Sequence, residues 1–597
     1  MRKERLMVNN TITFAEWIKR AVWLLFLLII GYLLTASIFS TSYLGGYQYM
    51  DYASGESVVN TTHTFYIRDH YLQHILLFAL TSFLLVRGTG LKNAEKSVLH
   101  KKYFPLMICI AAGIAAAGIV MAGGYAPKSD PQKVLDAASA LYHGDYSPLE
   151  RGAYLFRYPF QMGIILYFQA LFMLFGENNY VAFQVVNAVW IALSYYLFVK
   201  IAGILWGRKH KYGVFISLLG LFFFPYLLFA ALLYGTVAGM AFAMLSFYTL
   251  LLFDEKSEKG KILLPISGLS IGIAALLKPN YVIFLIAEIL YLLFSCFALK
   301  SAGKKKIMRK LLFTAALVIG FMICRMGVDR YLTHLNQGEK VTGIPMIACA
   351  VMGYMDGKTA PGWYNGYHTT LYADHDYDYE KTEEAAIEDL KKIISRFLHN
   401  PGETVGFFAR KAASQWNNPT FQSLLMLDGR EGRGGMNWIL RGNGRYLYIL
   451  TANLIQTWIL VGTFLYGVLR LRTSAFKELL LPVTFTGGIL AHMFCMEAQS
   501  LSAMVYFPVL IPLCICGYGE WRSLLLAWKE EIAGNGWRSE GGKRVRNKIV
   551  CLTAAAAVIC ALSYTWPFAK IFARNDDTGI FDTYTQETVH EDAVLSN

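Results

Sequence analysis

The chain has 597 residues, of which 55% are hydrophobic and only 16% are charged, and its mean hydropathy is +0.39. Soluble domains carry about a quarter charged residues, so this composition excludes an ordinary soluble protein. The net charge of +14 does not point to nucleic acid, because Lys and Arg crowd the short linkers between long apolar runs. These runs predict an all-α polytopic membrane protein.

The apolar runs predict about thirteen membrane-spanning helices. The first run, Ala21–Phe39, has no small-residue cleavage site after it and is typical of a retained helix rather than a signal peptide. The expected spans are residues 21–39, 71–86, 104–122, 180–206, 212–232, 236–253, 262–277, 281–299, 311–327, 446–469, 479–495, 501–519 and 549–566.

Seven linkers hold 32 of the 55 Lys and Arg residues, and the positive-inside rule places them in the cytoplasm. They are residues 1–20, 87–102, 208–211, 256–261, 300–310, 470–477 and 522–548. The N-terminus is then cytoplasmic, and the intervening connections face outward. Residue 130 is expected outside and residue 208 inside, so only one of the two apolar stretches between them can cross the membrane. The shorter one, Tyr158–Gly176, therefore does not cross. We expect it to lie at the outer interface, partly re-entrant, while 180–206 crosses.

Five regions follow from this topology. Residues 1–103 hold two extra N-terminal spans, and 104–327 form a module of seven spans with an outer loop at 123–179. Residues 328–445 form an extracytoplasmic loop domain, 446–566 the C-terminal spans, and 567–597 an extracytoplasmic acidic tail. Within the loop domain, apolar residues at helical spacing predict an amphipathic helix over Lys381–Leu398, and a second helix after Asn400-Pro401 that runs to Trp416.

Asp130 is the leading candidate for chemistry. It follows the apolar run 104–122 in the segment Gly123-Gly-Tyr-Ala-Pro-Lys-Ser-Asp130-Pro131, on the predicted outer face. A carboxylate at the membrane surface is a suitable general base for a lipid-borne substrate. The same sequence also predicts a structural role, in which Asp130 caps a helix that has Pro131 at its first position.

Three outer-face cations and one acid–imidazole pair are further candidates. Arg157 and Lys278 are placed to bind a lipid phosphate, although a lysine at this depth also reaches lipid headgroups without any binding role. His492 and Glu497 flank one outer turn, where they form either a wall of an outer cavity or a surface pair at a helix end. Arg151 is the third cation of this kind.

Several familiar signatures are absent from the sequence. It has no Walker loop, dinucleotide fingerprint, HExxH or GxSxG motif, and its cysteines show neither zinc spacing nor a disulfide framework. The acidic stretch 372–380 lacks the spacing and the glycine of a calcium loop. We therefore expect no metal and no cofactor, and no nucleotide-driven pump.

The order of four motifs resembles the GT-C membrane glycosyltransferases, in particular the bacterial branch related to protein O-mannosyltransferases and to the aminoarabinose transferase of lipid A. The motifs are Ser129-Asp130-Pro131 with the helix after it, Tyr158-Pro-Phe-Gln-Met-Gly163, Leu276-Leu-Lys-Pro-Asn280, and Cys495-Met-Glu-Ala-Gln-Ser500 followed by Tyr506-Phe-Pro508. The resemblance covers roughly residues 104–520. Two features depart from the family: Asp130 is followed by Pro131 rather than by a second acid, and the arginine expected before Tyr506 is missing.

The resemblance implies a GT-C-type bundle with a mixed outer loop domain, and a multi-pass enzyme of the cell membrane. It implies inverting transfer of a sugar from a polyprenyl-phosphate donor to a hydroxyl of a glycan, lipid or protein acceptor, with Asp130 as the base. The implied donor-binding residues are Arg157, Tyr158, Gln161 and Lys278, and the implied acceptor or cavity-wall residues are Lys411, Trp416, His492 and Glu497.

Two other functions remain open. A transporter or flippase of lipid-linked sugars predicts charges in the middle of spans or inverted repeats, and the sequence shows neither pattern. A glycan polymerase or ligase also has a large outer loop and is expected to use paired arginines there. In this sequence the segment Arg430–Arg433 is the one weak match to such a pair.

Overall fold

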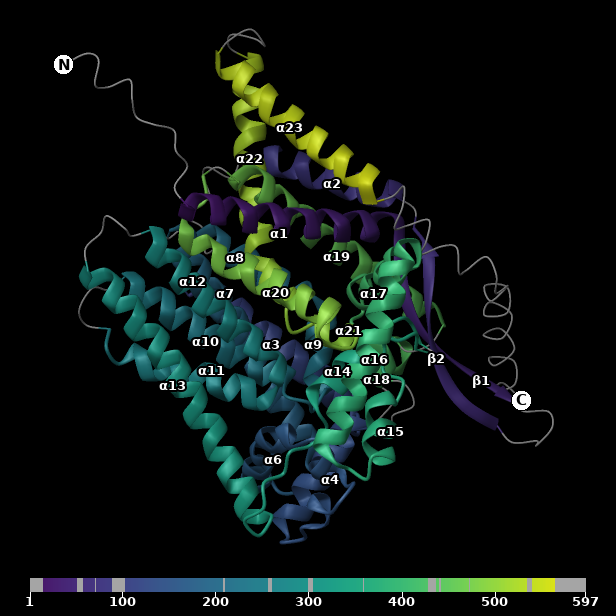
Figure 1. The fold of residues 1–597 in the computed structure, drawn as a ribbon. Coiled ribbons are helices and arrows are strands. Elements are labelled where there is room, and N and C mark those ends of the chain that lie inside the picture. The colour runs from purple at the N-terminus through teal and green to yellow at the C-terminus, as the bar shows by residue number, and fades with distance from the viewer. Residues whose placement is uncertain are drawn as a thin grey trace.

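The computed structural model describes residues 14–50, 57–69, 71–87, 103–207, 210–255, 260–298, 304–357, 359–427, 436–439, 442–471, 473–533 and 540–563. The described chain is built almost entirely of helices (Figure 1). The predicted acidic tail and the Arg430–Arg433 segment lie outside these residues.

The N-terminal half holds two strands and the first group of helices. The strands β1 (Ser40–Met50) and β2 (Ser57–Arg68) form an antiparallel hairpin in which Ser40 pairs with Arg68, and an irregularity falls between Tyr47 and Tyr49. The helices are α1 (Phe14–Phe39), α2 (Tyr71–Arg87), α3 (Phe104–Gly123), α4 (Asp130–Tyr142), α5 (Tyr154–Arg157), α6 (Met162–Phe175), α7 (Tyr180–Trp206), α8 (His210–Phe222), α9 (Phe224–Leu228), α10 (Thr236–Glu255), α11 (Leu263–Leu277) and α12 (Val282–Ala298).

The C-terminal half continues with further long helices and with the helices of the loop domain. They are α13 (Lys304–Leu335), α14 (Met346–Met352), α15 (Tyr367–Asp374), α16 (Tyr379–His399), α17 (Pro401–Trp416), α18 (Ser423–Leu427), α19 (Gly442–Arg470), α20 (Leu480–Phe494), α21 (Ser500–Ala503), α22 (Leu510–Ala533) and α23 (Glu540–Ser563). The predicted helices at 381–398 and after Asn400-Pro401 correspond to α16 and α17, and both predictions are confirmed.

The apolar composition and length of the helices agree with a multi-spanning membrane protein. Among the described residues, 8 helices are long and apolar enough to cross a bilayer, or up to 10 if each of two bent helix pairs is one span. Helices α2 and α11 are apolar but shorter. The count of thirteen spans remains a prediction, because it depends on how such short helices lie in the bilayer.

The chain is sharply bent at the start of Tyr158–Gly176, the apolar stretch that is predicted not to cross the membrane. The chain from Ser147 to Arg157 meets Pro159–Phe175 at an angle of 99°, as in a broken span or a re-entrant loop. Pro159 has no N–H to continue a helix from α5, and Tyr158 before it has a non-helical ψ of 61°. The bend separates α6 from α5 and sets α6 against α4.

The hydrophobic core continues through the C-terminal half. The most apolar part of the region Ser500–Glu530, which includes the start of α22, is entirely buried, and α22 packs against α19, α8 and α23. Helix α1 packs against α19, α20 and α23, so the N-terminal helix lies among the C-terminal ones (Figure 1).

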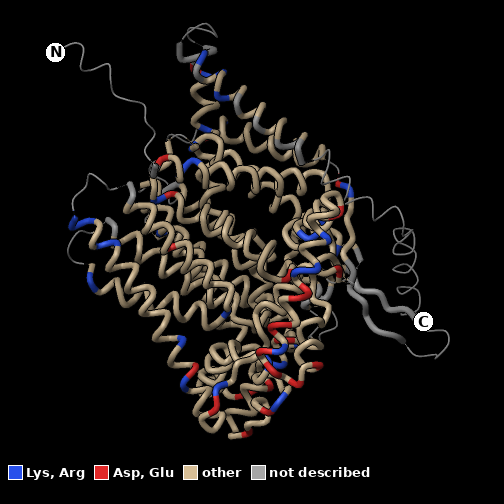
Figure 2. Tube along the Cα trace, in the orientation of Figure 1, with Lys and Arg blue, Asp and Glu red and all other residues tan. Residues whose placement is uncertain are grey.

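The charged residues divide between two regions of the molecule. Asp and Glu gather at the end formed by α4 and α14–α16, whereas the start of α13 on the opposite side carries five Lys and Arg residues within its first seven positions (Figure 2). The acidic end holds Asp130 and the loop domain. The orientation of the chain in the bilayer remains a prediction.

Candidate functional site

Asp130 begins helix α4 but does not cap it. The N-cap residue is Ser129, Asp130 and Pro131 occupy the first turn, and no side chain caps this end of the helix. The prediction that Asp130 is the N-cap is therefore wrong. The physical reason is the backbone at Ser129, whose φ of 57° and ψ of −134° turn the chain one residue earlier than the sequence suggests.

The position of Asp130 is nevertheless well defined. Pro131, Val134, Leu135 and Ala138 are buried, and α4 packs with this face against α6. The side chain of Asp130 stays exposed at the start of the helix. Non-glycine residues with a positive φ are uncommon and cluster at functional sites, so the strained Ser129 just before an exposed carboxylate draws attention to this point of the chain.

Lys278 lies in the turn between α11 and the one-turn helix at Pro279–Tyr281. Its backbone is extended, its side chain is only 5% exposed, and its Nζ lies 4.7 Å from the centre of the Tyr234 ring. Gly235 lets the Tyr234 turn approach, because a Cβ at this position would lie 2.2 Å from the carbonyl oxygen of Leu277, at a φ of 73°. The lysine is thus enclosed by protein and is not extended toward lipid headgroups.

The Tyr-Pro-Phe-Gln-Met-Gly segment reaches the same place from the other side. Gln161 is buried, and its Nε2 donates a hydrogen bond of 2.9 Å to the hydroxyl of Tyr234. The ring of Tyr154, in α5, lies 5.4 Å from the ring of Tyr158 at the start of this segment. Gly163 packs directly on α11, since a Cβ there would lie 2.5 Å from the carbonyl oxygen of Leu276. Gln161 therefore holds Tyr234 beside Lys278.

His492 joins the Glu497 turn to the Lys278 turn. Its Nδ1 lies 3.0 Å from the carbonyl oxygen of Glu497, and its Nε2 lies 3.1 Å from Nδ2 of Asn280. Because a carbonyl only accepts, Nδ1 carries the proton and Nε2 accepts from the Asn280 amide. The hydroxyl of Tyr506 donates to the carbonyl oxygen of Asn280 at 3.2 Å. His492 is 2% exposed and is a bridge between two turns, not an open cavity wall.

The carboxyl of Glu497 is poorly compensated. The residue is half-buried, and its Oε2 is buried without a hydrogen-bond partner. The pKa of Glu497 is raised to about 7, chiefly by burial and also by the charge of Asp130, while Lys278 and Lys411 partly oppose the rise. The carboxyl therefore titrates near neutral pH.

Asp130, Lys278 and Glu497 act on one another electrostatically. Burial lowers the pKa of Lys278 to about 8, and the charges of Asp130 and Glu497 oppose this fall. At neutral pH the lysine is still mostly protonated. A buried cation, an exposed carboxylate and a half-buried carboxyl, from the Lys278 turn, α4 and the Glu497 turn, thus lie within electrostatic range of one another. Three residues far apart in the sequence are brought together.

Arg157 and Tyr158 face the loop domain. The guanidinium of Arg157 lies 5.7 Å from the Tyr158 ring, and its Nε is buried without a hydrogen-bond partner. The Tyr158 hydroxyl lies 3.0 Å from Nε2 of His368, a buried residue of α15. Burial and the neighbouring charge of Arg157 lower the pKa of His368 to about 4, so the imidazole beside the arginine is neutral at pH 7.

Lys411 and Trp416 are interior residues. The Nζ of Lys411 donates to the carbonyl oxygens of Gly353, Met493 and Met496 at 2.6, 3.1 and 3.0 Å. Burial lowers the pKa of Lys411 to about 7, against the opposing effect of Glu497. Trp416 is 1% exposed and packs on the rings of Phe485, His492 and Tyr506. Neither side chain reaches a surface, so Lys411 holds the Glu497 turn and Trp416 supports His492.

Sequence reasoning missed four residues of this region: Tyr154, Tyr234, Asn280 and His368. In the sequence, the only indication of a role for Tyr234 is its place directly before Gly235 in a short predicted turn. Arg151 contacts the loop domain at the carbonyl oxygen of Asp376. No group of three or more His, Cys, Asp or Glu residues that could hold a metal ion lies together in the described part of the chain.

Composition and architecture together define an integral membrane protein with several transmembrane helices. The chain belongs to the family described as conserved hypothetical integral membrane protein, whose model matches residues 14–420. Among curated proteins, none matches the sequence.

Solved structures of an oligosaccharyltransferase from Archaeoglobus fulgidus are similar to this chain. The apo form has a TM-score of 0.41 at 12% identity, covering 78% of this chain and 56% of that chain. A complex with an inhibitory peptide and a dolichol-phosphate has a TM-score of 0.38 at 13% identity, with the same coverage. At these TM-scores the likeness carries no conclusion about activity.

Proposed function

We propose that the protein is a membrane glycosyltransferase that moves a sugar from a polyprenyl-phosphate donor to an acceptor hydroxyl at the outer face of the membrane. The observation that carries the proposal is the electrostatic influence of Asp130 and Glu497 on the buried Lys278, together with an exposed Asp130 carboxylate that does not cap helix α4. The Tyr158 and Lys278 motifs of the sequence also meet there, through Gln161 and Tyr234.

Each group has a definite part in this reaction. Asp130 accepts the proton of the acceptor hydroxyl as its oxygen bonds to the anomeric carbon. The bond from that carbon to the phosphate oxygen breaks on the opposite face, so the configuration inverts and polyprenyl phosphate leaves. Lys278 stabilises the negative charge that develops on the departing phosphate, and Arg157 is the second cation available. Glu497, with a carboxyl that titrates near neutral pH, hydrogen-bonds a sugar hydroxyl.

The burial of Lys278 favours this assignment over headgroup binding. An ammonium that interacts with lipid headgroups keeps its charged end in water, whereas Lys278 is enclosed beside Tyr234. Preorganised charge in a partly dehydrated site stabilises a transition state more strongly than the same charge in water. Burial of the Lys278 ammonium costs folding free energy, as expected for a charge that is preorganised for catalysis.

The test is transfer by the Asp130→Asn variant, reconstituted in liposomes with a polyprenyl-phosphate sugar and acceptor-containing envelope extract. We expect the variant to fold and to bind the donor lipid, but to transfer sugar about 10²–10⁴-fold more slowly. Glu150→Gln, which removes a negative charge from an exposed position in the same connection, is the control and should retain transfer. Full transfer by Asp130→Asn refutes the mechanism. Lipid translocation without transfer in the unmodified protein identifies a flippase instead.

A further inference from the structure

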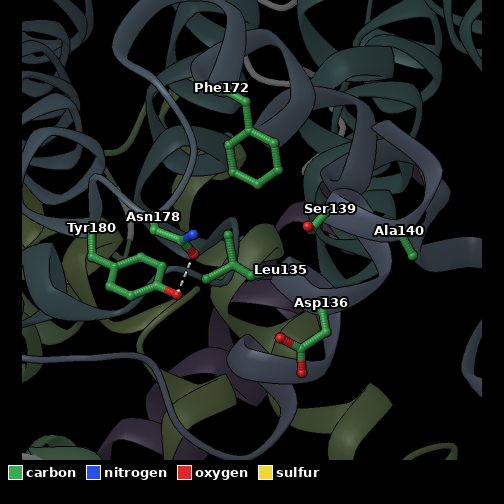
Figure 3. A pocket seen from close by; sticks show the side chains of 7 residues that line it. All are labelled: Leu135, Asp136, Ser139, Ala140, Phe172, Asn178 and Tyr180. Atoms are coloured by element: carbon green, nitrogen blue, oxygen red, sulfur yellow. Dashed lines mark hydrogen bonds between the residues drawn. The ribbon is translucent and has the colours of Figure 1, made fainter. Parts of the chain in front are cut away.

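A second candidate binding site lies on helix α4, away from Asp130. It is a partly open hollow of about 260 Å³ between α4, the end of α6 and the loop that leads into α7. Leu135, Asp136 and Ser139 line it from α4, and Phe172, Asn178 and Tyr180 line it from the other elements (Figure 3). The mechanism proposed above uses none of these residues.

The polar side chains around the hollow are held in fixed positions. The Tyr180 hydroxyl donates to Oδ1 of Asn178 at 2.9 Å, and Nε2 of Gln132 donates to Oδ1 of Asp136 at 2.5 Å. Ser139 donates to Glu177. Asn178 itself adopts a φ of 64°, which turns its side chain toward Tyr180. The rim is therefore preorganised rather than loosely solvated.

This arrangement leaves both donors and acceptors available. Within the described chain, no hydrogen bond engages Nδ2 of Asn178 or Oδ2 of Asp136. The amide offers two N–H donors and the carboxylate a free acceptor, a combination that matches the paired hydroxyls of a sugar ring. Phe172 and Leu135 supply an apolar surface for the C–H face of the same ring.

Charge and size narrow the ligand class. The carboxylate of Asp136 lines the hollow and no Lys or Arg is among the lining residues, so an anion such as phosphate is repelled. The volume is just below the ~300–1,000 Å³ of drug-sized ligand sites, which suits a single ring. We propose that this hollow is a saccharide subsite that takes one neutral or amino-sugar ring.

The role of the subsite rests on the proposed function. Asp136 lies six residues after Asp130, about 9 Å further along the axis of α4. A glycan acceptor whose hydroxyl reaches Asp130 is long enough to place a more distant ring against Asp136 and Tyr180. The subsite thus favours a glycan acceptor over a short lipid or a peptide.

Binding is tested by saturation-transfer NMR on the full detergent-solubilised chain. The probes are the methyl glycosides of mannose, glucose and N-acetylglucosamine, with inorganic phosphate as the anionic comparison. Asn178→Gly removes the amide but tolerates the positive φ, and Asp136→Asn keeps the shape of the side chain. Tyr146→Phe removes an exposed hydroxyl outside the hollow and is the matched control.

We expect at least one glycoside to bind, and about tenfold weaker binding in Asn178→Gly and in Asp136→Asn, as for the loss of one good hydrogen bond. Asp130→Asn and Tyr146→Phe should bind it normally. The inference is overturned if no glycoside binds, if binding is the same in both pocket variants, or if phosphate is the ligand. Absence of transfer by the unmodified protein, with glycoside binding intact, refutes the proposed function but not the subsite.

Discussion

Replacing Lys278 with methionine should stabilise the protein and abolish its activity. Burial lowers the pKa of Lys278 from 10.5 to about 8, with the attraction of Asp130 and Glu497 already included. The difference corresponds to about 3 kcal/mol of folding free energy. Because the folded pKa is the lower one, this penalty is complete below pH 8 and disappears as the pH rises through 10.5. Methionine avoids it and forfeits the contact with the Tyr234 ring, which is worth about 1 kcal/mol.

The net expectation for Lys278→Met is a gain of about 2 kcal/mol at pH 7, together with a loss of transfer of about 10²–10³-fold. Thermal unfolding in detergent at pH 7 and at pH 10.5 measures the first effect, which should vanish at the higher pH. Lys133→Met, at an exposed position of α4, is the control and should change neither property. A lower unfolding midpoint for Lys278→Met at pH 7 would show that the lysine is there for stability, and would refute this reasoning.

Two further predictions concern the turns around this lysine. Glu497 has a folded pKa of about 7, above its ordinary 4.5, so the stability it contributes is complete below pH 4.5 and is lost as the pH rises through 7. In Glu497→Gln the unfolding midpoint should therefore depend less on pH over that range. The control Glu403→Gln, at an exposed position of α17, should show the same pH dependence as the unmodified protein. Gly235→Ala combines a φ of 73° with a clash against Leu277 and should destabilise by roughly 2–4 kcal/mol, whereas Gly144→Ala, with a φ of 77° in open space, should lose only about 1 kcal/mol; equal unfolding midpoints for the two alanine variants would contradict this.

Much of the helical architecture could be predicted because its signals are local. Long apolar runs mark spans wherever they occur, and the amphipathic pattern of Lys381–Leu398 needs no knowledge of its partner. The start of α17 was equally clear, since Asn400-Pro401 is a standard way to begin a helix. By contrast, the capping role of Asp130 was wrong, because a positive φ at Ser129 is set by the folded loop and leaves no trace in the sequence.

The candidate site could be predicted only in part, because it is assembled from distant segments. Asp130, Lys278 and Glu497 were recognisable as unusual charges, but their mutual influence depends on three turns that meet only in the folded bundle. Lys411 lies on an amphipathic helix, where a lysine normally marks the solvent-exposed face. Its burial depends on three carbonyl groups from two other segments, which no local pattern encodes.

The buried ammonium of Lys411 also limits how this protein can be divided. Two of its three carbonyl partners, Met493 and Met496, belong to the membrane bundle, and the N–H of Ala498 donates to the carbonyl oxygen of Gly362 in the loop domain. An excised segment 328–445 would keep the lysine and lose most of its acceptors. Residues 328–445 are therefore not expected to fold correctly when they are expressed alone or moved to another protein. A fragment must also include the turn with Met493, Met496 and Ala498.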